Sequence, residues 1–169
     1  MNRILKTISF SLVMLFAVSA GAQKFGYINT QDLISQVPEV KEANSNIETY
    51  RKQLQGKYQN MIQALQAKYQ ALEQKQAGGD ISPKMLETEA LKLKEEEKKI
   101  AEFEQSSQQK IVDKSETLLK PLRDKIQAAI DQVAAENGYD YIFDASLGML
   151  LYADKTTDVS ALVKAKLGI

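Results

Sequence analysis

Gly78-Gly79-Asp80-Ile81-Ser82-Pro83 is the stretch that decides the fold of this 169-residue chain. Glycine ends helices because it adopts the left-handed backbone conformation without a steric penalty. Ser-Pro is the opposite signal, since serine caps the start of a helix and proline is favoured at its first position. We therefore expect two helices joined by one tight turn, with Gly78 as the left-handed residue.

The segment before the turn, residues 41–77, has helical periodicity throughout. At 1.5 Å per residue such a helix extends about 55 Å, far more than the three turns of an average globular helix. Its apolar positions, spaced in an 11-residue repeat typical of nearly straight helix pairs, are Ile47, Tyr50, Leu54, Tyr58, Met61, Leu65, Tyr69 and Leu72. A hairpin this long cannot surround one compact core, so we expect a projecting arm.

The limb that follows the turn is less apolar than the first. Leu86, Ala90, Leu93, Ile100 and Phe103 share one face of the predicted helix. The same face also meets Glu97, Glu104 and Ser107. A buried leucine contributes roughly 1.5–3 kcal/mol, so layers that have Glu or Ser instead are weakly held. We expect the arm to bend there.

The two ends of the chain have short strand-like segments in place of long helices. Residues 24–29 are predicted as one strand, and residues 139–144 and 149–153 as a hairpin of two more. Three short strands make a poor sheet because their edges are unpaired. We therefore expect a body, residues 23–40 and 118–169, in which strands of several subunits merge, and an arm at residues 41–117.

The first 22 residues are predicted to be a cleaved signal peptide. Arg3 and Lys6 precede an apolar run, and Ala20-Gly21-Ala22 is typical of a cleavage site before Gln23. Without those two basic residues the chain has 20 Lys and Arg against 22 Asp and Glu, a net charge of −2. A nearly neutral exported chain argues against nucleic acid as a partner.

Residue types that carry most enzyme chemistry are absent from this sequence. It has no histidine and no cysteine, so the usual general base, zinc ligands and disulfides are excluded. Gly56-Lys57 lacks the pattern of a phosphate-binding loop. Asp140 and Asp144 fit strand-end and turn positions better than an acid–base pair. We expect no enzyme, no cofactor and no metal.

Several segments strongly resemble the Skp (OmpH-like) family of periplasmic chaperones. They are residues 24–29 followed by Val37-Pro38, residues 129–140, and the segment Leu151-Tyr152-Ala153. The resemblance implies an α+β fold and a jellyfish-like homotrimer, with helical tentacles on a small β-barrel-like body. It also implies an ATP-independent holdase that binds unfolded outer-membrane proteins in the periplasm and prevents their aggregation before membrane insertion.

This hypothesis assigns candidate residues to two surfaces. The arm candidates for client binding are Tyr50, Leu54, Tyr58, Met61, Leu65, Tyr69, Met85 and Phe103. For any one of them we favour the seam between the two limbs over a client surface, which would place clients on the Gln-rich flank beside the seam. The body candidates for oligomerisation are Phe25, Tyr27, Ile28, Tyr141, Phe143, Leu151 and Tyr152.

A second hypothesis is a structural or adaptor hairpin of the cell envelope that docks its tip on one fixed partner. Such a tip needs apolar or arginine anchors, and residues 77–83 offer only Ile81. We therefore favour the holdase. Between Lys68 and Lys99 seven lysines are balanced by seven acidic residues. That balance puts lipopolysaccharide and the membrane surface in doubt as partners.

Overall fold

The computed structural model of the chain describes residues 23–169, so the predicted signal peptide lies outside the described residues. The chain divides into two compact units. We call Ser35–Lys125 the arm unit, and the segment up to Ile34 together with Ile126–Ile169 the body unit.

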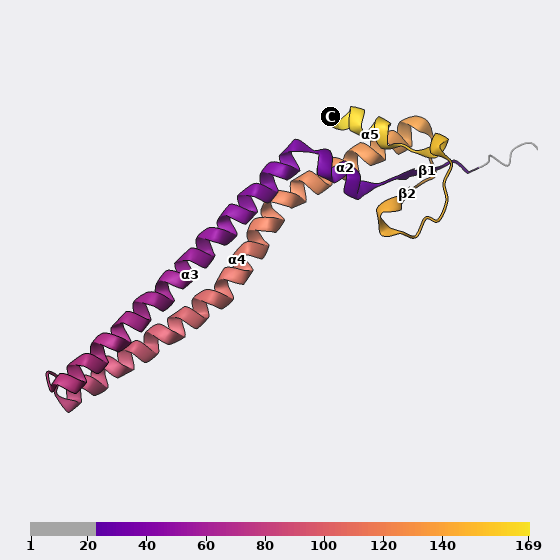
Figure 1. The fold of residues 1–169 in the computed structure, drawn as a ribbon. Helices are drawn as coiled ribbons and strands as arrows, with labels where there is room; N and C mark the ends of the chain where they lie inside the picture. The colour runs from indigo at the N-terminus through magenta and orange to yellow at the C-terminus, as the bar shows by residue number, and fades with distance from the viewer. Residues whose placement is uncertain (1–22) are drawn as a thin grey trace, which may run out of the picture. The chain divides into compact units, whose positions relative to one another are not determined.

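One long helix and the greater part of a second make up most of the arm unit. Helix α3 spans Pro38–Gly78 and contains 41 residues, and α4 spans Pro83–Asn137 and contains 55. Within the arm unit they lie side by side as a hairpin (Figure 1). Proline at the start of each helix suits a position whose backbone N–H has no helical partner. The predicted helical hairpin is confirmed.

The turn differs from the prediction by one residue. Gly79, and not Gly78, is left-handed, with φ 73°. Its N–H donates to the Gln76 carbonyl at 3.2 Å, and the Asp80 N–H donates to the Lys75 carbonyl at 2.9 Å. These bonds use the last carbonyls of α3. Both glycines tolerate this conformation, so the sequence pattern does not distinguish them.

The body unit contains a two-stranded parallel sheet. Strand β1 (Phe25–Ile28) pairs with β2 (Tyr141–Asp144), from Phe25 opposite Tyr141 to Ile28 opposite Asp144. Helix α2 (Thr30–Gln36) follows β1, and α5 (Ser160–Leu167) is the last helix. The side chains that are almost fully buried all belong to the body unit and form its core: Ile28, Leu33, Val133, Val159 and Val163.

The predicted strand at residues 149–153 is wrong for the single chain. Ala145–Leu147 forms a short 3₁₀ helix instead of a hairpin turn, and residues 149–153 have no regular structure. The Asp144 carboxylate accepts the Ser146 N–H at 2.9 Å and holds this turn. A strand needs a partner edge for its backbone groups, and the 3₁₀ turn does not return residues 149–153 to the edge of β2. The merged barrel of several subunits remains a prediction.

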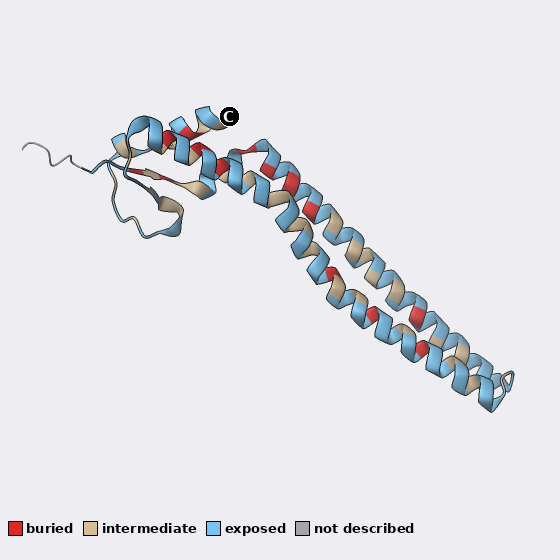
Figure 2. Cartoon of the chain, turned by 180° about the vertical axis from the view of Figure 1, so that it is seen from behind, coloured by how far each residue is buried: buried red, intermediate tan, exposed pale blue. Residues whose placement is uncertain are grey.

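Only a small part of the surface of the two arm helices is buried. In Figure 2 the buried residues of α3 and α4 are single bands separated by partly exposed and exposed ones. This is the pattern of two helices that bury only a shared seam. Among the described residues no helix combines the length and apolarity needed to cross a bilayer.

Candidate functional site

The seam between α3 and α4 takes up most of the apolar residues that the sequence singled out. Leu65, Leu93 and Ile100 form its buried cluster. Tyr58, Met61, Tyr69 and Leu72 pack against this cluster and are partly buried. Four of the arm candidates, Tyr58, Met61, Leu65 and Tyr69, therefore lie at the seam, and their part in client binding stays a prediction.

Two glutamates of α4 border this seam and bind tyrosines of α3. The Tyr69 hydroxyl donates to Glu97 Oε1 at 3.1 Å, and the Tyr58 hydroxyl donates to Glu104 Oε2 at 3.4 Å. Burial raises the pKa of Tyr69, and so do the hydrogen bond to Glu97 and its negative charge. The tyrosine rings supply apolar area while their hydroxyls satisfy the carboxylates.

Ion pairs also connect the two helices inside the arm unit. Lys68 Nζ lies 2.5 Å from Glu96 Oε1, and Lys125 Nζ lies 2.7 Å from Glu39 Oε1. The hydrogen bond from Lys125 and its positive charge lower the pKa of Glu39. Exposed pairs of this kind contribute little to stability, but they fix the register of the hairpin.

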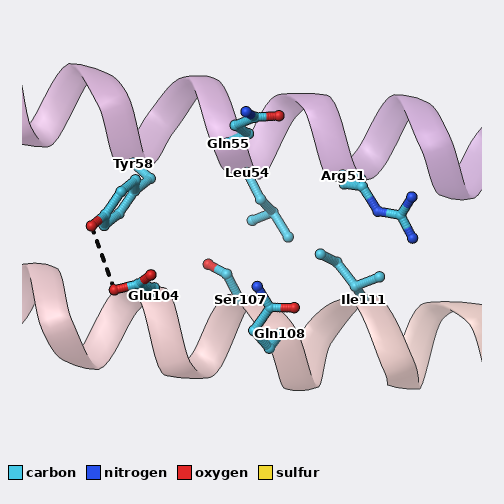
Figure 3. A pocket seen from close by; sticks show the side chains of 8 residues that line it. All are labelled: Arg51, Leu54, Gln55, Tyr58, Glu104, Ser107, Gln108 and Ile111. Carbon is cyan, nitrogen blue, oxygen red and sulfur yellow. Dashed lines mark hydrogen bonds between the residues drawn. The ribbon is translucent and has the colours of Figure 1, made fainter.

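The seam opens beyond Glu104 into a cavity of about 300 Å³. Figure 3 shows Leu54 of α3 facing Ser107 and Ile111 of α4, with the Tyr58–Glu104 hydrogen bond at one end. Ser107 is the buried polar residue here, with 7% of its surface exposed. Within residues 23–169 its Oγ has no hydrogen-bond partner.

The arm unit also exposes large apolar side chains that do not face the seam. Met85, Leu91 and Val112 are 60%, 58% and 59% exposed. Of these the sequence analysis named only Met85. Given 100° of rotation per residue, Leu91 lies on the side of α4 opposite Leu93 and Ile100, and Val112 lies about 100–120° away from these two. A shallow groove next to Leu91 is lined by Lys94, Lys98 and Ala101, and a second one next to Val112 by Gln105, Ser106 and Gln109.

Phe103 and Tyr50, two other arm candidates, are partly buried. The Phe103 ring has Lys57 Nζ at 5.2 Å and Lys110 Nζ at 5.6 Å from its centroid. Ammonium groups at this distance are attracted to the face of an aromatic ring. Phe103 is therefore engaged within the arm unit.

The body unit carries an exposed aromatic cluster on its sheet. The ring centroids of Phe25 and Tyr141 are 5.7 Å apart, and those of Tyr141 and Phe143 are 6.3 Å apart. The three side chains are nevertheless 44–53% exposed. Of the other body candidates, Ile28 is in the core and Tyr27 is half-buried. Leu151 and Tyr152 are exposed almost completely, at 97% and 83%.

Nothing in these surfaces resembles a catalytic centre. Among the described residues no group of three or more acidic side chains is placed to hold a metal ion. The surfaces consist of scattered apolar side chains between charged and amide groups. Such surfaces form many weak contacts with flexible partners.

Comparison with known proteins agrees with this architecture. The family described as "Outer membrane protein (OmpH-like)" matches residues 24–167. The chain is 28% identical over 169 residues to the chaperone protein Skp of Photorhabdus laumondii, covering 98% of this chain and 100% of that one. It is also 28% identical over 163 residues to Skp of Yersinia enterocolitica, covering 95% and 96%.

A solved structure has the same fold. An OmpH-like protein from Caulobacter crescentus superposes with a TM-score of 0.74, covering 88% of this chain and 86% of that one. The two sequences are 17% identical.

Proposed function

We propose, because the chain belongs to the OmpH-like family of outer membrane proteins, that it is a chaperone of unfolded outer-membrane proteins. Its relatives at 28% identity are named chaperones. The prediction that the chain is not an enzyme is confirmed by this family. As a chaperone it acts as a holdase in the periplasm, without ATP, after a signal peptide has exported it.

The exposed apolar side chains on α4 are the observation that carries the proposal. Leu91 and Val112 are more than half exposed, and lysines and glutamines lie between them. Separated weak contacts of this kind suit an unfolded client, because no single contact selects one fixed client sequence. Several arms around one client multiply these contacts through their high effective concentration. The buried seam cluster of Leu65, Leu93 and Ile100 supports the arm and does not contact the client.

The body unit joins three copies of the chain in this proposal. The support is the exposed cluster of Phe25, Tyr141 and Phe143, together with the exposed Leu151 and Tyr152, because exposed apolar patches mark interaction surfaces. The backbone of residues 149–153 pairs with strands of neighbouring copies. Light scattering on Leu151→Asp should give a monomer, while the parent chain gives a trimer. A parent chain that is a stable monomer would refute this assembly.

The chaperone proposal is tested with aggregation of several unrelated unfolded outer-membrane barrel proteins. The chain should suppress light scattering for all of them. Leu91→Gln with Val112→Gln should weaken suppression several-fold, because truncating central apolar contacts typically has the largest cost in an interface. The matched control, Lys94→Gln with Lys98→Gln, changes charge on the same face and should act like the parent. Binding to only one folded partner would favour the adaptor hairpin.

A further inference from the structure

We propose that the cavity beside Ser107 receives single tyrosine side chains of the unfolded client. This inference rests on the proposed chaperone function and adds a defined pocket to it. The cavity lies entirely inside the arm unit, between α3 and α4, and its volume is about 300 Å³. That is the lower end of the range of about 300–1,000 Å³ for small-molecule pockets, so it suits one side chain.

Each helix contributes one aliphatic side chain to the walls of the cavity, and polar side chains line the rest of it. Leu54 projects from α3 and Ile111 from α4, one turn from Ser107 (Figure 3). An aromatic ring placed between two aliphatic side chains removes apolar area from water on both of its faces. The space between these two side chains therefore suits a flat apolar group.

Ser107 adds one polar requirement to these apolar walls. Its Oγ is buried and has no partner within the described residues. Two charged groups of the lining are engaged, since Glu104 accepts from Tyr58 at 3.4 Å and Arg51 donates to Glu48 at 3.1 Å. The amides of Gln55 and Gln108 complete the polar part of the lining. A ligand with a single hydroxyl would satisfy Ser107.

A phenol fulfils both requirements. Its ring fits between Leu54 and Ile111, and its hydroxyl can donate to or accept from Ser107 Oγ. A phenylalanine ring would leave the serine hydroxyl unpaired, and a charged side chain would lose its hydration without an opposite charge. Outer-membrane barrels carry girdles of aromatic residues, so unfolded barrel proteins present tyrosines to such a pocket.

The test uses p-cresol, which is the tyrosine side chain, and toluene, which is the phenylalanine side chain. Each is titrated into the chain beginning at Gln23, with methyl groups of leucine and isoleucine labelled for NMR. We expect saturable shifts of the Leu54 and Ile111 methyl signals with p-cresol. Toluene should bind about tenfold more weakly, because it leaves the buried hydroxyl unpaired.

Variants of neighbouring serines provide the matched control. Ser107→Ala should remove the preference for p-cresol over toluene, and Ser107→Leu should fill the cavity and abolish both shifts. Ser106→Ala should leave both affinities unchanged, because the Ser106 hydroxyl already donates to the Phe103 carbonyl at 3.0 Å. Neither Ser107 variant removes a hydrogen bond of the Ser107 side chain within the described residues, so the arm should remain folded.

Two outcomes would overturn the pocket. One is equal binding of p-cresol and toluene; the other is a Leu54 response that persists in Ser107→Leu. The absence of any saturable shift would mean that the cavity holds water only, which also overturns the inference. These outcomes are independent of the chaperone proposal, because that proposal fails only when the parent chain does not suppress aggregation of unfolded barrel proteins.

Discussion

The carboxylate of Asp144 joins the two ends of the chain within the body unit. Its oxygens accept the Thr30 N–H at 3.2 Å, the Thr30 hydroxyl at 2.6 Å and the Ser146 N–H at 2.9 Å. Burial alone would raise the pKa of Asp144, but these hydrogen bonds outweigh it and lower the pKa below its ordinary value of 3.8. These bonds explain the turn position that the sequence predicts for Asp144.

Asp144→Ala should therefore lower the free energy of unfolding by about 1–2 kcal/mol at neutral pH. Because the folded pKa is depressed, the carboxylate stabilises the fold above its ordinary pKa, and this contribution is lost as the pH falls through the folded value. Urea unfolding at fixed protein concentration should show the difference between parent and variant shrinking below about pH 4. The bonds from Thr156 also lower the pKa of Asp154, so the difference for Asp154→Ala should follow the same pH trend. A difference independent of pH would contradict this account.

Alanine substitution at two glycines of the hairpin should change the free energy of unfolding in opposite directions. Gly79 has φ 73°, a conformation that costs an L-residue roughly 1–2 kcal/mol, so Gly79→Ala should destabilise the chain. Gly56 lies inside α3, and nothing lies within 4 Å of a Cβ built there. Gly56→Ala should therefore stabilise the chain by about 1 kcal/mol. Chemical unfolding measures both; a loss of stability in Gly56→Ala would show that its environment is crowded.

Among the elements, α4 is packed unevenly within the arm unit. Leu93 and Ile100 belong to the buried cluster, whereas the next layers contain Glu104 and Ser107 beside a cavity. Each missing apolar layer removes packing that would hold the local helix closed. The uneven packing follows from side-chain size and charge at positions that share one face.

Amide hydrogen exchange should accordingly be faster at residues 104–111 than at residues 93–100. We expect at least a tenfold difference, since local opening near the cavity disrupts fewer buried contacts. Ser107→Leu should slow exchange at 104–111, because it supplies the missing apolar layer. Equal protection of the two segments in the parent would show that the arm is a uniformly packed rod.

Elements of this protein were predictable where a local pattern determines them. Helical periodicity and Ser82-Pro83 identified α3, α4 and their turn. The strand at residues 149–153 was not predictable for one chain, because a strand exists only when an edge is available to pair with it. The sequence pattern also could not predict the cavity, since its volume depends on how the side chains of Leu54 and Ile111 are oriented around Ser107.

For the whole molecule, charge balance should make client capture insensitive to salt. The chain after the predicted signal peptide carries a net charge of −2, so no strong field draws an acidic client from beyond the screening length of about 8–10 Å. We expect the association rate with an unfolded barrel protein to change less than about threefold between low and physiological salt, whereas electrostatic steering gives tenfold or more. Stopped-flow mixing measures this rate. A steep fall with salt would mean that a local cluster such as Lys94, Lys98 and Lys99 steers clients.

The parallel pairing of β1 with β2 sets an order of folding events as the chain emerges from its N-terminus. Phe25 would emerge first, yet its partner Tyr141 comes 116 residues later. Strand β1 therefore cannot pair until almost the whole chain has emerged. Once the hairpin forms, the ion pair of Glu39 with Lys125 shortens the flexible path between the strands to about 27 residues, which reduces the closure cost by roughly 1 kcal/mol. We hypothesise that a chain truncated before Tyr141 is helical by circular dichroism but cleaved rapidly by proteases at β1; protection of β1 there would disprove it. Each newly exported copy would thus present its finished arm before it could be joined to its neighbours.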